Sequence, residues 1–199
     1  MRKSIFIKIL VLYLLCAGSL YAQIPELKNW ANDLTGTLSQ SELESLNRDL
    51  KTFQDSTSNQ VVFLIIPSID GNAIEDYSYQ VADKNKIGTK ENRNGILFLI
   101  AKNDHKNRIE VGYGLEGALP DAISNSILRN EVRPFFREGK YYEGIKSGLE
   151  AIKAATKGEY KAKEQKSGSG SILKGIFMLV IIIAYVFFRF FGGGGGRHA

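Results

Sequence analysis

Two short, uninterrupted apolar runs constrain the fold of this chain more than any other feature. They cover residues 61–67 and 95–100, and polar residues bound each of them. A half-exposed strand alternates apolar and polar residues, whereas a run without alternation is typical of a central strand that is buried on both faces. Helices must therefore cover both sides of the predicted sheet.

Two helices are predicted around the first apolar run. After an irregular lead-in at 29–33, Ser39 and Glu42 form a capping-box pair ahead of apolar residues at helical spacing. Asn72 and Glu75 repeat this cap chemistry before a second helical pattern. These two segments are the first candidates to cover the faces of the sheet.

A hairpin and two further helices complete the predicted order. The second apolar run is joined through the polar turn 103–107 to the alternating strand 108–113. Helical spacing returns at 123–128 and 142–152, and Pro134 predicts a break or kink between them. The order helix, strand, helix, strand, strand, helix, helix predicts an α/β fold, a three-layer α/β/α sandwich with a central mixed sheet.

The N-terminal residues have the composition of a secretory signal peptide. Residues 1–22 begin with MRK, continue with an apolar stretch and end in small residues before a predicted cleavage after Ala22. Lipidation of Cys16 is the alternative, which Leu15 disfavours because a small residue is expected there. Since no other cysteine is present, the exported domain is expected to fold without disulfides.

A second membrane-type segment lies near the C-terminus. Residues 172–191 are almost wholly apolar and long enough to cross a bilayer as a helix. Polar residues are missing from every face, which disfavours the alternative of a buried core helix. With the signal peptide, this segment predicts a single-pass cell-membrane protein whose main domain is exported to the periplasmic or extracellular side. The predicted division is signal peptide 1–22, folded domain 24–156, flexible basic linker 157–171, transmembrane helix 172–191 and Gly-rich tail 192–199.

The net charge of +5 arises from the flanks of the chain and not from its folded domain. Residues 24–156 contain 16 Lys and Arg against 19 Asp and Glu. A nucleic-acid partner is therefore not expected. The basic linker is expected to act as a plain tether, with contact to anionic headgroups as the alternative.

The residue types of the domain limit its chemistry. His105 is its single histidine and lies in the polar turn of the predicted hairpin, where a solvated side chain is expected. Catalytic triads, cysteine nucleophiles and zinc sites with several His or Cys ligands are therefore not expected. Carboxylates, amides and loop carbonyls remain, and these are the ligands of Ca²⁺ or Mg²⁺.

One glycine-rich segment concentrates such oxygen atoms. Residues 112–122, GYGLEGALPDA, form the junction between a predicted strand and a predicted helix. The three glycines permit a tight turn, and Glu116 and Asp121 flank the junction, so a hard cation is one possible guest. The alternative is a plain connection in which Asp121 caps the helix.

Four sequence blocks together resemble a known family. They are NDLTGTLS at 32–39, RNGILFLI at 93–100, GYGLEGALPD at 112–121 and YYEGI at 141–145. In this order they resemble the TPM domain, named after a thylakoid lumen protein, a photosystem II repair factor and a nematode acetylcholine-receptor modulator. The third block is the most specific. A signal peptide before the domain, with a membrane helix and glycine-rich tail after it, also resembles many bacterial members, although this tail is short.

The resemblance implies an α/β/α sandwich, divalent-metal binding in some members and acid-phosphatase activity in plant relatives. Carried over block by block, the metal candidates for Ca²⁺ or Mg²⁺ are Asp33, Asn94, Glu116 and Asp121, and Arg93 is the substrate-binding candidate. Because strand ends usually collect ligands in such folds, the four are expected to converge at one end of the sheet. Structural alternatives remain open, namely turns at the first two residues, solvated side chains at Glu116 and Arg93, and a helix cap at Asp121.

Two functions follow as expectations. The first is a membrane-tethered accessory or maintenance module of an envelope protein complex, which binds a protein partner or a cation on the exported side. The second is a metal-assisted acid phosphatase, a phosphomonoesterase in which the cation polarises a phosphoryl oxygen and activates water. The second function lacks an evident nucleophile and paired phosphate-binding arginines in the motif blocks.

Overall fold

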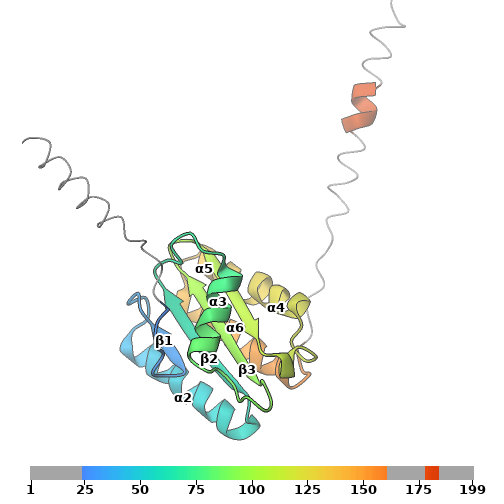
Figure 1. Ribbon diagram of the computed structural model, residues 1–199. Helices are drawn as coiled ribbons and strands as arrows, with labels where there is room; N and C mark the ends of the chain where they lie inside the picture. The colour runs from blue at the N-terminus through green and yellow to red at the C-terminus, as the bar shows by residue number, and fades with distance from the viewer. Residues whose placement is uncertain (1–23, 161–177, 184–199) are drawn as a thin grey trace, which may run out of the picture. The chain divides into compact units, whose positions relative to one another are not determined.

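A four-stranded mixed sheet organises the domain (Figure 1). The computed structural model describes residues 24–160 and 178–183, which fall in two separate units, residues 1–162 and 163–199. The strands of the first unit lie in the order β1 (Ala31–Asp33), β2 (Gln60–Ile66), β3 (Gly95–Ala101) and β4 (Lys106–Val111). The first three strands are parallel, and β4 is antiparallel to β3. The predicted α/β fold with a mixed sheet is confirmed.

Helices cover both faces of this sheet. They are α2 (Gln40–Thr57), α3 (Ile74–Lys84), α4 (Asp121–Ile127), α5 (Arg133–Arg137) and α6 (Tyr141–Thr156), with a 3₁₀ turn η1 (Tyr113–Leu115) and a π-helical turn η2 (Leu128–Val132). The α3 helix packs on one face, whereas α2, α6 and the short helices between β4 and α6 pack on the other. The strands therefore lie between two helical layers (Figure 1).

The two faces of the central strands contribute side chains to two separate apolar cores. In β2, Phe63 and Ile65 belong to the core shared with α2 and α6, and Leu64 belongs to the core shared with α3. The same alternation in β3 places Phe98 in the first core and Leu99 in the second. This is why both strands are apolar without interruption, since neither side of them faces water.

The two predicted helix starts have different outcomes. Ser39 and Glu42 form the predicted capping box at the start of α2. The predicted cap of α3 is wrong, because its N-cap is Ala73, which has no capping side chain. The side chain of Asn72 instead donates to the carbonyl of Ile69 and holds the preceding turn.

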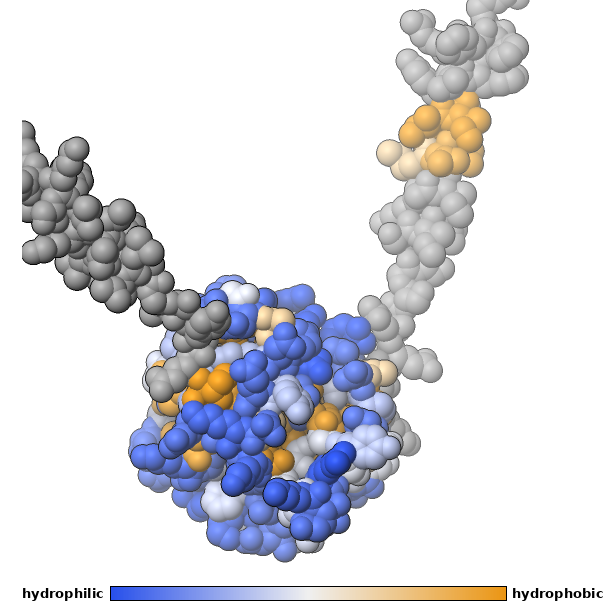
Figure 2. Space-filling view, viewed as in Figure 1, coloured by the Kyte–Doolittle hydropathy of each residue, from blue (hydrophilic) through white to orange (hydrophobic). Residues whose placement is uncertain are grey.

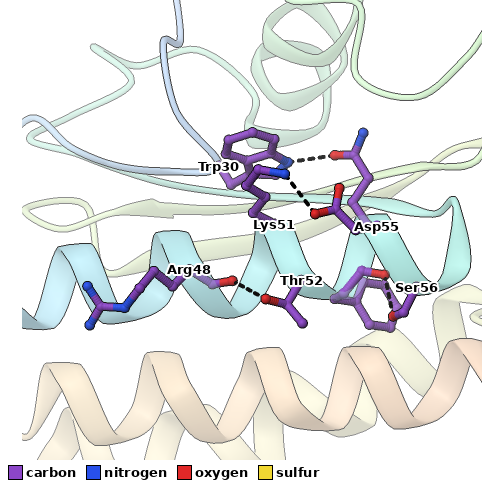
Figure 3. A network of polar contacts seen from close by, with 8 residues as sticks. Trp30, Arg48, Lys51, Thr52, Asp55 and Ser56 are labelled. Atoms are coloured by element: carbon purple, nitrogen blue, oxygen red, sulfur yellow. Dashed lines mark hydrogen bonds and ion pairs between the residues drawn. The ribbon is translucent and has the colours of Figure 1, made fainter.

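The predicted irregular lead-in contains a strand. Ala31–Asp33 pairs in parallel with residues 63–65 of β2 and forms one edge of the sheet. Trp30, directly before it, lies against α2, where its indole N–H donates to Gln54 at 2.6 Å and the Lys51 ammonium lies 5.7 Å from its ring (Figure 3). The lead-in is therefore tied to both the sheet and the first helix.

The second unit is described only at residues 178–183. These six residues are helical and exposed, and all are apolar. Over the described parts of the chain, no helix has the length and apolar character needed to cross a membrane. The predicted signal peptide, the linker beyond Tyr160 and the rest of the predicted segment 172–191 lie outside the described residues.

Candidate functional site

The four predicted oxygen ligands do not converge, and that part of the prediction is wrong. Asp33 is the last residue of β1 and lies level with Ile65 of β2, which in turn pairs with Ile100 of β3. Asn94 directly precedes the start of β3. Because these strands are parallel, about six residues of strand, or about 20 Å, separate the two positions. A single ion cannot contact both side chains.

Asp33 organises the loop between β1 and α2. One carboxylate oxygen accepts from the backbone N–H and the hydroxyl of Thr35, both at 2.7 Å, and the other accepts from the N–H of Leu38 at 2.8 Å. Burial raises the pKa of this carboxyl, but the hydrogen bonds from Leu38 and Thr35 outweigh burial and hold the pKa below its ordinary value. The turn alternative therefore describes Asp33.

Asn94 also organises a turn. Its side chain is 6% exposed. The amide oxygen accepts from the backbone N–H of Thr89 at 3.0 Å and from its hydroxyl at 3.2 Å, and the amide nitrogen donates to the carbonyl of Ser58. Both ends of the amide are thus engaged in joining the loop before β3 to the end of α2.

The side chains of Glu116 and Asp121 make no hydrogen bond or ion pair with another described residue, and both residues are exposed. Glu116 follows η1. Asp121 lies in the first turn of α4, whose N-cap is Pro120, so Asp121 is not the helix cap. Among the described residues, no group of three or more His, Cys, Asp or Glu side chains is arranged to hold a metal ion.

Glycines lock two loops together at the amino end of β3. A Cβ atom on Gly114 would clash with the backbone carbonyl of Asn92, and one on Gly112 would clash with that of Arg93. The Gly114 N–H donates to the Arg93 carbonyl at 3.1 Å, and the Gly112 N–H donates to the Gly95 carbonyl at 2.8 Å. These backbones approach each other too closely for any larger residue.

A groove of about 590 Å³ opens beside this glycine lock. It runs between the C-terminal half of α3, the loop at 86–93, and the chain from Glu110 to Glu116. Glu110 is held inside the groove, where it accepts from the Ser78 hydroxyl at 2.9 Å and from Arg108 Nε at 3.0 Å. The groove thus has a fixed, backbone-defined wall and an anchored carboxylate.

Two exposed tyrosines line this groove. Tyr79 is 63% exposed and Tyr113 is 72% exposed. The guanidinium of Arg93 lies 6.0 Å from the ring centroid of Tyr113, and Arg93 itself has a left-handed φ of 47°. The face shown in Figure 2 is mostly hydrophilic, with apolar residues in small patches. Among the exposed large hydrophobic residues of the described range 24–160, the two aromatic ones, Tyr79 and Tyr113, both line the groove.

The structure brings together some predicted site residues and adds others. Arg93 and Glu116 both line the groove, whereas Asp33 lies at the other end of the sheet. Sequence reasoning missed Tyr79 and Glu110. Tyr79 carried a signal, because the apolar positions of α3 point to the core and leave Tyr79 on the opposite face. Glu110 carried none, since its anchoring depends on contact with the distant Ser78.

The groove carries charged and aromatic side chains that can bind another molecule. Its lining combines Lys86, Lys90 and Arg93 with Asp83, Glu110 and Glu116, so it presents both signs of charge beside tyrosine rings. Such a surface can pair with a polar segment of another molecule through hydrogen bonds and ring contacts.

Comparison with known proteins places this architecture among relatives. The family model described as TPM domain matches residues 31–155. The solved N-terminal domain of a P. gingivalis protein is 30% identical, with a TM-score of 0.61, and the match covers 69% of this chain and 87% of that one. No match was found among curated proteins.

Two more distant solved structures share the fold. The N-terminal domain of a Corynebacterium glutamicum protein is 16% identical, with a TM-score of 0.51 and coverage of 75% of this chain and 92% of that one. A protein from the psychrophilic bacterium Bizionia argentinensis is 18% identical, with a TM-score of 0.55 and coverage of 66% and 89%. At these identities the likeness concerns the fold alone.

Proposed function

The chain belongs to the TPM domain family, and from this premise we propose that it is a membrane-tethered, exported accessory module that binds a segment of an envelope protein in the groove between α3 and β4. One observation carries the proposal. Two exposed tyrosines line the groove, Tyr79 on α3 and Tyr113 between the two glycines whose contacts fix the other wall. The sequence resemblance alone does not indicate which part of the domain a partner would contact.

The groove limits the conformational entropy that is lost when a partner binds. Tyrosine buries a large amphipathic surface while losing few side-chain rotations, so it is enriched where proteins meet. A wall that is already rigid loses little further freedom when a partner binds. The groove of this domain combines both properties.

The charges define the chemistry of the partner segment. Lys86, Lys90 and Arg93 attract carboxylates, whereas Asp83 and Glu116 attract ammonium or guanidinium groups. A segment with one aromatic or aliphatic residue between charges of both signs fits this arrangement best. A purely apolar segment would leave the charged groups unpaired.

The tether is a proposal that rests on the sequence. The predicted signal peptide and the apolar segment 172–191 support an exported domain on a single membrane helix. Protease added to spheroplasts is expected to digest the domain. Protection of an epitope inserted near Ser56 would contradict this topology.

Photo-crosslinking in living cells tests the groove. A benzophenone amino acid at Tyr113 keeps an aromatic ring in place, and the same amino acid at Leu34, 53% exposed in the loop after β1, serves as the control. One discrete adduct is expected from position 113, and Arg93→Glu should abolish it. Equal adducts from both positions, or none from position 113, would contradict the proposal.

A divalent cation, Ca²⁺ or Mg²⁺, is a subordinate part of the proposal. Of the four predicted ligands, only Glu116 and Asp121 have carboxylates without hydrogen bonds to other described residues, so loop carbonyls and water would complete the coordination. Calorimetric titration with Ca²⁺ should show weaker binding after Asp121→Asn. If the wild type does not bind Ca²⁺ at millimolar concentration, the proposed cation site is wrong.

The acid-phosphatase alternative receives no specific support from the groove. Asp33 and Asn94 are engaged in their turns, so the predicted four-residue ion site that would polarise a phosphoryl group is not assembled. Metal-dependent phosphate release that is lost with Asp121→Asn would reinstate this alternative.

A further inference from the structure

A second cavity lies at the opposite end of the sheet from the groove. Its volume is about 400 Å³, and it opens beside the carboxyl end of β3, the hairpin turn, α5 and the start of α6. Cavities that hold small molecules typically measure about 300 to 1,000 Å³. No residue lines both this cavity and the groove, so a ligand here would not depend on the proposed partner.

The charged lining of this cavity is entirely basic. Lys102, Lys106, Arg133 and Arg137 line it together with His105, and its lining includes no Asp or Glu. The side chains of Lys106, Arg133 and Arg137 have no hydrogen bond or ion pair with another described residue. This concentration of unpaired positive charge contrasts with the folded domain, in which acidic residues outnumber basic ones.

Lys102 occupies a fixed position in this lining. Its ammonium donates to the Thr37 hydroxyl at 2.9 Å and lies 5.0 Å from the ring centroid of Tyr141. Both contacts restrict a long side chain that would otherwise rotate freely. The charge is therefore held beside an aromatic surface.

Aromatic rings form the apolar part of the cavity. Phe136 and Tyr141 line it and pack against each other with ring centroids 4.9 Å apart. Gly144 makes this packing possible, because a Cβ atom there would lie 2.7 Å from Cε1 of Phe136. The cavity thus places cations next to a surface suited to an apolar group.

The π-helical turn η2 determines how α5 faces the cavity. Pro134 has no N–H to donate to the helix. In the turn before it, Leu128–Val132, the backbone hydrogen bonds have π-helical geometry. One extra residue in a turn rotates the following helix by about 100°. Arg133 and Arg137 are four residues apart and share a face, which this rotation directs to the cavity.

We propose that this cavity binds a small organic oxyanion, a carboxylate or phosphate group carried on an apolar, preferably planar, body. Arginine pairs with either group through two parallel N–H donors, and the paired arginines of α5 supply such donors. Phe136 and Tyr141 cover the apolar body. The proposed role is binding of this anion.

Titration of the fragment 23–160, which holds every described member of both apolar cores, tests the proposal. The probes are phenyl phosphate, benzoate, inorganic phosphate and phenol, followed by calorimetry and amide chemical shifts. At least one aromatic anion should bind about tenfold or more tightly than inorganic phosphate or phenol, with shifts at 100–107 and 133–141. The tighter of the two anions identifies the preferred acidic group.

Matched variants separate this site from general charge attraction. Arg133→Gln or Arg137→Gln should weaken binding about tenfold or more, since each removes a charged hydrogen-bond donor. Arg129→Gln removes the same charge from an exposed residue of η2 that does not line the cavity, and it should change affinity less than about twofold. Lys106→Gln, on the exposed hairpin, serves as a second test variant if an α5 variant unfolds.

Three results would overturn the proposal. In the first, neither aromatic anion binds at concentrations up to about 10 mM, so its affinity is too weak for a specific site. Arg129→Gln weakens binding as much as Arg137→Gln does, which would indicate charge attraction only. The amide shifts map to the groove residues 86–93 and 110–116 instead of to the cavity.

Discussion

At the scale of single residues, similar motif positions have different physical roles. Gly112 and Gly114 are required because a side chain would strike the backbone of the neighbouring loop, whereas a Cβ atom on Gly117 would meet nothing within 4 Å. Asp33 and Glu116 are both motif carboxylates, yet the first holds a turn and the second is exposed. Sequence alone could not separate the glycines, because their contacts join distant segments, whereas the contacts of Asp33 are local.

The glycine contacts predict a stability difference. Gly114→Ala should destabilise the fragment 23–160 by more than about 2 kcal/mol, because the new Cβ must displace the Asn92 backbone. Gly117→Ala is the matched control in the same loop and should change stability by less than about 0.5 kcal/mol. Urea unfolding measures both, and equal effects would show that the loops are not locked as described.

Asp33 predicts a pH dependence of stability. Its folded-state pKa lies below the ordinary value of 3.8, so its stabilising effect is fully present above that value and is lost as the pH falls towards the folded-state pKa. Asp33→Asn should therefore cost on the order of 1 kcal/mol at pH 7 and progressively less as the pH falls below 3.8, because protonation of the wild type then removes the advantage of the charged carboxylate. Urea unfolding at several pH values measures this, and a penalty that is constant with pH would contradict the assignment.

At the scale of helices and strands, sequence patterns predicted the elements whose structure depends on contacts between residues close in sequence. The capping box of α2 was predictable because Ser39 and Glu42 are three residues apart. The three-residue β1 was not, because Asn32 and Asp33 have low strand propensity and the strand exists through pairing with β2. The sequence predicted a break or kink at Pro134, whereas α5 runs through Pro134 and the ladder changes one turn earlier, in the π-helical turn η2 that packs against α6.

The cap of α2 gives a prediction at this scale. Ser39→Ala removes the side chain that accepts from the N–H of Glu42, so it should cost about 1 kcal/mol of unfolding free energy. Ser45→Ala lies inside the same helix and should be neutral or slightly stabilising, because alanine favours helix. Thermal unfolding compares the two, and an equal loss for both variants would contradict the cap.

At the scale of the whole molecule, every described member of the two apolar clusters belongs to residues 24–160. The fold class was predictable because two unbroken apolar strands are compatible with few folds. The site was not predictable, because it depends on which strand ends lie at the same end of the sheet. The short β1 decided this point by placing Asp33 away from Asn94 and Glu116.

Independent folding of the domain follows from this arrangement. The fragment 23–160 should unfold cooperatively in a single transition without the segment 172–191, and reducing agent should not change its melting temperature. The physical reason is that the fragment holds every described member of both cores and contains no cysteine. Calorimetry measures this, and a fragment that stays unfolded would show that the apolar segment belongs to the core.

Hydrogen exchange on the full-length chain tests most directly whether the groove is the functional surface. Deuterium uptake is compared between the chain in native membranes and the same chain purified in detergent. Occupation of the groove by an envelope partner predicts slower exchange in native membranes at residues 86–93 and 110–116, with no change in the loop after β1. Equal exchange of these groove segments in both preparations would contradict the proposed function.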